Sequence, residues 1–286
     1  MTEPLFDSVQ YKASQKESWS HVAGGWKKWW KTMERSARPA SDLLVELARI
    51  GPGHTVLDVA TGIGEPAVTA AYKVGPTGTV IATDQATLML AIARERAAEL
   101  GLTNVEFREM DAETLDLPEP RFDAVLSRWG LMFLPNLTGA LANMHRLLKP
   151  DGRLAAAVWG APTNVPFISL AINTVRQQLQ SPPPPPGTLG PFSLADVTIL
   201  ERALAQAGFS DIRSEPLTLT FEWASAEDYT RFQQDIAAPV VAMVAKEPPA
   251  RQVEVWRAIT EAARQYAAAD GTVRMPGETI CVTAKR

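Results

Sequence analysis

Between residues 55 and 160, short apolar runs alternate with segments in which apolar residues recur every three or four positions. The first pattern is typical of buried strands and the second of amphipathic helices. Turns rich in Gly and Pro separate the two kinds of segment. Strands that alternate with helices in this way predict a doubly wound, mainly parallel sheet. The predicted strands are 55–59, 80–83, 104–108, 122–127 and 153–159, and the predicted helices are 66–74, 87–100 and 136–148.

The regular alternation ends near residue 160. Beyond it, a run of five prolines at 182–186 interrupts the helical pattern. Such a run favours an extended loop. Near the C-terminus, alternation of Leu and Phe returns and indicates two more strands. The predicted elements are a helix (166–180), a proline-rich loop (181–191), a helix (194–207), a strand (211–223), a helical insertion (225–275) and a last strand (279–283).

The N-terminal forty residues are polar but contain four tryptophans. At about 100° per residue, one helical face collects Trp19, Val22, Trp26, Trp29, Trp30 and Met33. Gly24-Gly25 weakens such a helix, so we expect either two short helices or one kinked helix. Residues 41–50 predict a separate amphipathic helix with Ser41 as its N-cap.

These patterns together predict a Rossmann-like α/β fold with seven strands. We divide the chain into an N-terminal helical lid, a core that holds the proline-rich loop, a helical cap insertion and the final strand of the core. The corresponding ranges are 1–40, 41–224, 225–275 and 276–286.

Composition narrows the function classes. The net charge of −4 and the pI of about 5.5 disfavour a nucleic-acid partner. Cys281 is the single cysteine, so no intramolecular disulfide is expected, and no His, Asp or Glu spacing is typical of a metal site. The first residues, Met1–Pro4, lack the apolar stretch of a secretion signal, and no run is long enough to span a membrane. We therefore expect a cytoplasmic protein.

Two polar features follow the first two predicted strands. The segment 56–65 (VLDVATGIGE) is a strand that enters a glycine turn, where the backbone can approach a ligand closely. Asp84 ends the next strand, about twenty residues further on, where an acidic side chain can accept hydrogen bonds from ribose hydroxyls. Either feature alone is also consistent with a plain turn or a helix cap.

Two more features follow later strands. Asp111 and Ala112 come after strand 104–108, and Asp111 could accept a hydrogen bond from an adenine amino group. Ser127, Arg128 and Trp129 stand where strand 122–127 meets its loop. Ligands of open α/β sheets bind at such carboxyl ends of strands.

Five segments in this order resemble the class I S-adenosylmethionine-dependent methyltransferases, and among them the ubiquinone/menaquinone C-methyltransferase type. The segments are VLDVATGIGE, VIATDQATLMLAIARERA, VEFREMDAETLDLP, FDAVLSRWGLMFL and HRLLKPDGRLAAAVWG. The resemblance implies a seven-stranded sheet with an antiparallel last strand. It also implies S-adenosylmethionine as cofactor and an N-terminal segment that covers the cofactor site.

The resemblance also implies which residues bind the cofactor. The glycine turn would hold its methionine part, the acidic end of the second strand its ribose, and the Asp-Ala pair its adenine, with one residue of the fourth strand beside them. Carried over, these positions are Thr61, Gly62, Ile63, Gly64, Asp84, Gln85, Asp111, Ala112 and Ser127.

The expectations for the acceptor come from the positions and side-chain types of the candidate residues. Methyl transfer from a sulfonium needs alignment and exclusion of water more than a conspicuous catalytic side chain. We expect metal-independent transfer to a small apolar or aromatic acceptor, with Trp29, Arg128 and Trp129 as substrate-binding candidates. His21 and Tyr11 are the candidates for a catalytic base or hydrogen-bonding group.

Three alternatives remain at the level of sequence. A nicotinamide-dependent oxidoreductase would explain the glycine turn, although Ala67 replaces the third glycine of its usual pattern. A protein that binds S-adenosylmethionine without turnover would share every motif. An RNA methyltransferase is disfavoured because no Asn-Pro-Pro-Tyr-type motif follows the fourth strand.

Overall fold

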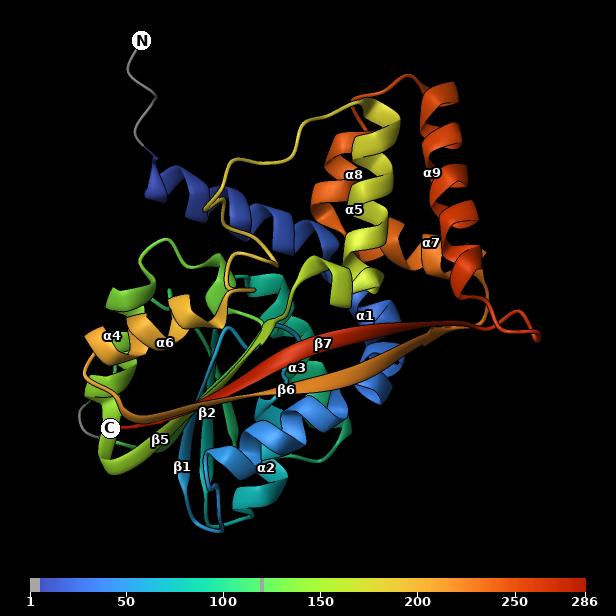
Figure 1. The fold of residues 1–286 in the computed structure, drawn as a ribbon. Helices are drawn as coiled ribbons and strands as arrows, with labels where there is room; N and C mark the ends of the chain where they lie inside the picture. Colours follow the sequence, from blue (N-terminus) through green and yellow to red (C-terminus); the bar gives the residue numbers. More distant parts are fainter. Residues whose placement is uncertain (1–5, 119–120) are drawn as a thin grey trace.

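A seven-stranded mixed sheet forms the centre of the molecule in the computed structural model, which describes residues 6–118 and 121–286 (Figure 1). The strand order is β3-β2-β1-β4-β5-β7-β6. Strand β7 runs antiparallel to both of its neighbours, whereas the other pairs are parallel. The predicted fold class, with its antiparallel last strand, is therefore confirmed. The strands are Thr55–Val59 (β1), Thr79–Asp84 (β2), Val105–Glu109 (β3), Phe122–Arg128 (β4), Leu148–Trp159 (β5), Ser210–Trp223 (β6) and Val273–Lys285 (β7).

Helices cover both faces of the sheet, as expected for a doubly wound fold. The C-terminal part of α1 lies with α2 and α3 on one face, and α4 and α6 lie on the other (Figure 1). The helices of these two layers are Ser8–Leu47 (α1), Ala67–Val74 (α2), Thr87–Glu99 (α3), Leu137–Leu147 (α4) and Val197–Gln206 (α6).

Helix α1 differs from the prediction. It continues without interruption through Gly24-Gly25, through Pro39 and through the segment expected to be a separate helix, so Ser41 lies inside it and is no N-cap. Burial explains this result. Leu44 and Val45 pack against one face of the sheet, and tertiary packing overrides the low helix propensity of Gly and Pro. Asp7 is the actual N-cap, and its carboxylate accepts the amides of Val9 and Gln10. The start of the expected lid and the Met1–Pro4 segment lie outside the described residues.

A helical insertion separates the two strands of the last hairpin. Strands β6 and β7 pair from Ser210 with Lys285 to Trp223 with Val273, and the chain between them forms three helices. Together with α5, these helices form a layer beyond the carboxyl edge of the sheet (Figure 1), which we call the cap. The helices of the cap are Pro166–Leu179 (α5), Ala226–Ile236 (α7), Ala238–Val244 (α8) and Pro249–Ala263 (α9).

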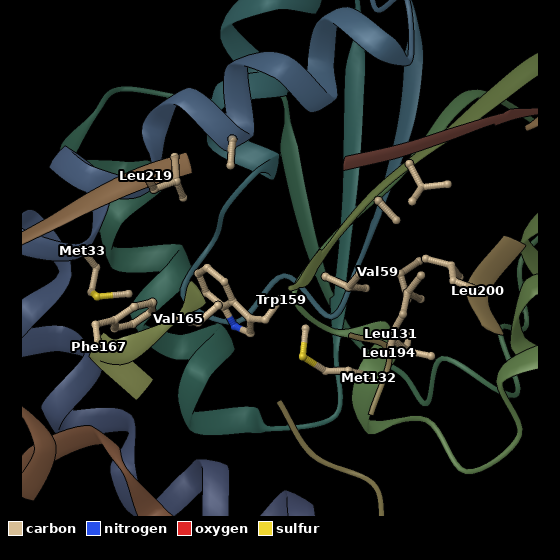
Figure 2. Packing of buried hydrophobic residues seen from close by; sticks show 14 of the residues in the cluster. Met33, Val59, Leu131, Met132, Trp159, Val165, Phe167, Leu194, Leu200 and Leu219 are labelled. Carbon is tan, nitrogen blue, oxygen red and sulfur yellow. The ribbon is translucent and has the colours of Figure 1, made fainter. Parts of the chain in front are cut away.

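The cap and the sheet share one apolar cluster. Figure 2 shows Trp159 and Val165 between Met33 and Phe167 on one side and Met132 on the other. Because α1, β5 and α5 all contribute to this cluster, the cap is packed against the sheet rather than tethered by a linker. Within the described part of the chain, no helix is long and apolar enough to cross a membrane.

Candidate functional site

The glycine turn connects β1 with α2. Ala60, Gly62 and Gly64 have φ values of 59°, 56° and 100°, a region that only glycine adopts without cost. A Cβ built on Gly62 would meet nothing within 4 Å, whereas one on Gly64 would lie 3.3 Å from the Cβ of Ala93 on α3. Open space therefore lies beside Gly62, whereas Gly64 is packed closely against α3.

Asp84 joins the end of β2 to this turn. Its Oδ2 accepts the Gly62 N–H at 2.8 Å, and its Oδ1 accepts the Ala86 N–H at 2.8 Å. Burial raises the pKa of Asp84, although the amide donors oppose the shift. Each carboxylate oxygen has a second lone pair, so Asp84 can still accept hydrogen bonds from a diol. Gln85 follows it and is half-buried.

Two hydroxyls are buried at this edge. Among the described residues, Ser127 Oγ makes no hydrogen bond, whereas the Thr61 hydroxyl lies against the Asp58 carboxylate and lowers its pKa. Buried polar groups in native proteins are normally paired. Because one hydroxyl follows β1 and the other ends β4, the two neighbouring strands each offer a polar group at the carboxyl edge.

The loops after β1 and β4 touch each other. A Cβ on Gly130 would lie 2.5 Å from the Cβ of Ala60 and 3.1 Å from Ser127 Oγ, so no other residue fits at position 130. Trp129, just before it, has a left-handed φ of 61°. Non-glycine residues in this region are strained by about 1–3 kcal/mol and cluster at functional sites.

The Asp111-Ala112 pair is contacted by the N-terminal part of α1. Lys12 Nζ donates to Asp111 Oδ2 at 2.7 Å and to Glu113 Oε2 at 3.0 Å. The hydrogen bond that Lys12 donates to Asp111 raises the pKa of Lys12. Asp111 Oδ1 accepts the Glu113 N–H at 2.9 Å, and Ala112 is half-buried.

We call residues 8–33 of α1 the lid, because they lie across the carboxyl edge of the sheet (Figure 1). Their apolar face packs against the glycine turn and α3: Trp19, Trp26 and Trp30 contact a cluster that contains Ile63, Ala86, Met89 and Ile92. These three tryptophans of the predicted stripe therefore face the expected cofactor edge, whereas Trp29 and Met33 pack in the cluster shared with the cap.

The two catalytic candidates lie on different sides of the lid. His21 is exposed, as its helical phase opposite the tryptophans predicts. The Tyr11 hydroxyl is buried and has no partner among the described residues, and burial raises its pKa to about 12. Tyr11 is therefore protonated at neutral pH and can act only as a hydrogen-bonding group.

Comparison with known proteins identifies the domain that carries these motifs. A family described as "Methyltransferase domain" matches residues 56–152. The ubiquinone/menaquinone biosynthesis C-methyltransferases UbiE of Pseudomonas fluorescens (strain Pf0-1) and Pseudomonas syringae pv. tomato are 36% and 37% identical over 144 residues. Residues 56–152 therefore form a methyltransferase domain. The matched part is 50% of this chain and 52% of each UbiE protein, so the chain spans about half the length of these relatives.

Solved structures agree on the fold of the methyltransferase domain. The YcgJ protein from Bacillus subtilis superposes with a TM-score of 0.56 at 18% identity, covering 87% of this chain and 98% of that chain. The cyclase SpnF superposes with a TM-score of 0.53 at 23% identity, covering 86% and 80%. At these identities the likeness concerns the fold alone.

The donors and acceptors of the methyltransferase domain fit S-adenosylmethionine. The Ser127 hydroxyl, unpaired among the described residues, needs a polar partner, and the free space at Gly62 admits one. Asp84 lies within reach of the same turn through the Gly62 amide. The roles of these residues, and of Ile63, Gln85, Asp111 and Ala112, remain predictions.

The substrate-binding candidates are already engaged by protein groups. Arg128 donates to Glu34 Oε1 at 2.8 Å and to Ser41 Oγ at 2.7 Å. Trp129 is stacked on Trp159 at 4.1 Å, and the Arg128 guanidinium covers its ring at 4.8 Å. Since Trp159 occupies one face of Trp129, Arg128 must cover the other. A planar acceptor therefore finds no free face on Trp129 in this arrangement.

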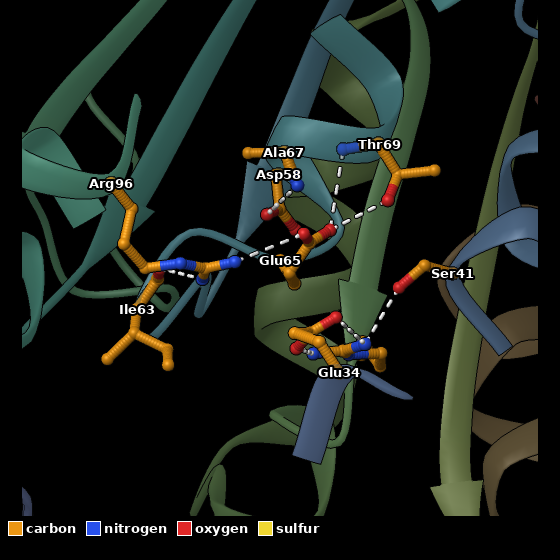
Figure 3. Close-up of polar contacts among 9 residues, drawn as sticks. Glu34, Ser41, Asp58, Ile63, Glu65, Ala67, Thr69 and Arg96 are labelled. Atoms are coloured by element: carbon orange, nitrogen blue, oxygen red, sulfur yellow. Dashed lines mark hydrogen bonds and ion pairs between the residues drawn. The ribbon is translucent and has the colours of Figure 1, made fainter. Parts of the chain in front are cut away.

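Behind the glycine turn lies a buried charge network that the sequence analysis did not single out (Figure 3). Arg96 donates to the Ile63 carbonyl and to Glu65, and Asp58 accepts the Ala67 N–H at 3.0 Å at the start of α2. Burial raises the pKa of Asp58 to about 7, although the Thr61 hydroxyl and the charge of Arg128 oppose the shift. An acidic residue inside the apolar run of β1 is the signal that could have revealed the network.

Ser127→Ala separates a binding role from a structural one. We expect the free energy of unfolding to change by less than about 0.5 kcal/mol, because no protein hydrogen bond is lost. Affinity for S-adenosylhomocysteine should fall about tenfold if the hydroxyl contacts the ligand. Urea unfolding and calorimetric titration measure the two effects. Ser41→Ala is the control. The Ser41 hydroxyl accepts a hydrogen bond from Arg128, so this variant should lower the free energy of unfolding more than it lowers the affinity for S-adenosylhomocysteine. Unchanged affinity in Ser127→Ala would exclude Ser127 from the cofactor site.

Proposed function

We propose that the protein transfers a methyl group from S-adenosylmethionine to a small apolar or aromatic acceptor, without a metal ion. The observation that carries this proposal is the joint arrangement of Asp84 and the glycine turn, linked by the 2.8 Å bond to the Gly62 amide. This pair offers a carboxylate for a ribose next to free space at a flexible backbone.

Binding and orientation are the work that the chain's own residues perform. Thr61 to Gly64 would hold the methionine part, Asp84 and Gln85 the ribose, Asp111 and Ala112 the adenine, with Ser127 at the fourth strand. The cofactor, when bound, supplies a methyl group already activated on a sulfonium. The lid excludes water from this edge, and exclusion of water strengthens every electrostatic contact inside.

A proton must leave whenever the attacked oxygen, nitrogen or carbon carries hydrogen. Tyr11 would then orient the acceptor by a hydrogen bond, since its hydroxyl is buried and unpaired among the described residues. His21 would serve only if the lid turns, because its side chain is exposed.

The acceptor class rests on the aromatic residues packed beyond the carboxyl edge. A chain of aromatic contacts runs from the end of β4 into the cap, through Trp129, Trp159, Phe167, Phe221, Trp223, Phe232 and Trp29. These rings pack against one another and, apart from the half-buried Trp129, are almost fully buried, so an acceptor would meet them only where lid and cap separate; such contacts would favour apolar or aromatic molecules. Small molecules are favoured over nucleic acid by the net charge of −4. We place the reaction in the cytoplasm, because the single cysteine is typical of a chain with no disulfide framework.

The test is titration of the protein with S-adenosylmethionine, S-adenosylhomocysteine and NADH, followed by transfer of a labelled methyl group to quinols, phenols, amino acids and phosphoethanolamine. Micromolar binding of the first two and labelling of quinols or phenols would support the proposal. Binding of NADH alone would overturn it in favour of an oxidoreductase. Cofactor binding without any labelling would favour a binding protein, and labelling confined to the charged acceptors would overturn the acceptor class.

A further inference from the structure

The lid crosses helix α7 of the cap at Gly25. A Cβ built on Gly25 would lie 2.0 Å from the backbone oxygen of Asp235 and 2.6 Å from its carbonyl carbon. Both are backbone atoms, so no side-chain movement could make room. Gly25 therefore sets how closely the two helices approach, whereas a Cβ on the neighbouring Gly24 would meet nothing within 4 Å.

The same Asp235 binds the lid through its side chain. Its Oδ2 accepts the Trp29 Nε1–H at 2.7 Å and the Lys28 Nζ at 2.6 Å. Trp29 is buried and meets Phe232 of α7 edge to face, with ring centroids 5.6 Å apart. Backbone, carboxylate and aromatic contacts thus converge within one turn of the lid.

Two exposed ion pairs of the lid are weaker anchors. Lys16 pairs with Glu109, and Lys27 pairs with Glu95, with all four side chains about half exposed. Exposed ion pairs contribute little to stability and are screened by salt. The crossing at Gly25 is instead close-packed and only partly exposed, so it fixes the position of the lid along α7.

We infer that Gly25 and Asp235 form a docking point through which the helical insertion holds the lid over the cofactor edge, so that Asp235 is a positioning residue for cofactor retention. This inference rests on the proposed function. On the apolar face of the lid, Trp26 and Trp30 pack against the cluster of Ile63, and Lys12 binds Asp111. When the lid leaves α7, these contacts over the glycine turn and the Asp-Ala pair leave with it.

The experiment compares Gly25→Ala with its matched control Gly24→Ala. In the ligand-free proteins, hydrogen exchange of residues 8–33 reports docking. With ligand, the dissociation rate of S-adenosylhomocysteine and the split between KM and kcat report retention. We expect Gly25→Ala to exchange faster over the lid, to release the ligand about tenfold faster and to raise the KM for the cofactor, with kcat unchanged at saturation. Gly24→Ala should protect the lid from exchange and retain the ligand at least as well as the wild type does, because Ala favours helix.

Asp235 supplies a second, independent variant. Asp235→Ala should resemble Gly25→Ala, and Asp235→Asn, which keeps an oxygen for Trp29, should recover most of the retention. Unchanged exchange over the lid in Gly25→Ala would overturn the docking point. Faster exchange with an unchanged dissociation rate would overturn its role in retention. A wild-type protein that binds no S-adenosylhomocysteine yet shows the exchange difference would overturn the proposed function, and the retention role with it, while leaving the docking point in place.

Discussion

Glu34→Ala is expected to lower the free energy of unfolding by about 3–5 kcal/mol. The Arg128 side chain is 8% exposed and Glu34 is 15% exposed, and their closest atoms are 2.8 Å apart. Although burial works against its charge, Glu34 raises the pKa of Arg128 above its usual value. Among the described residues, removal of Glu34 leaves this buried guanidinium with the Ser41 hydroxyl as its hydrogen-bond partner and with the more distant charges of Glu65 and Asp58. Breaking a buried pair from one side is costly.

Urea unfolding measures this effect, and the same helix supplies the control. Arg38 and Asp42 form an ion pair at 3.8 Å with both side chains more than half exposed, so Asp42→Ala should cost less than about 0.5 kcal/mol. The double variant Glu34→Ala/Arg128→Met should recover most of the loss, because no unpaired buried charge remains. A loss below about 1 kcal/mol in Glu34→Ala would contradict a buried, paired arginine at this position.

Asp84→Ala is expected to weaken S-adenosylmethionine binding by about 100-fold or more. Two hydrogen bonds to a carboxylate would be lost with the ribose, and the Gly62 and Ala86 amides would lose their acceptor as well. Calorimetric titration of the folded variant measures the change. Asp84→Asn, which keeps one oxygen, should fall between the wild type and Asp84→Ala.

The control for charge alone is Asp116→Ala, since Asp116 is exposed. It should bind the cofactor like the wild type. If Asp84→Ala retained wild-type affinity while its melting temperature fell, Asp84 would be a cap for the turn and not a ligand of the cofactor.

The sheet could be predicted from sequence because the parallel strands β1, β2, β4 and β5 contain short apolar runs bounded by turn residues. The path of α1 could not. Gly24-Gly25 and Pro39 suggest helix ends by propensity, yet the structure uses Gly25 for close contact with Asp235, more than two hundred residues away in the chain. Local propensity carries no information about such a contact.

The candidate site likewise has a part that the sequence predicts and a part that it does not. Asp84, Asp111 and Ser127 follow strands whose carboxyl ends must meet, so their common location follows from topology. The partners of Arg128 cannot be predicted from topology, because Glu34 lies on a helix whose position depends on packing. A buried arginine needs a carboxylate, but nothing in the local sequence says which one.

Strand β7 has a consequence for how the chain reaches this state. Residues 273–285 are synthesised after the other six strands, yet they lie between β5 and β6 inside the sheet. Until they emerge from the ribosome, β5 has one open edge and β6 has no partner strand in the sheet. Unpaired edges of this kind invite association between nascent chains. Production of the protein should therefore benefit from slow translation or chaperone supply, and loss of even this one strand should yield aggregates rather than a smaller folded core.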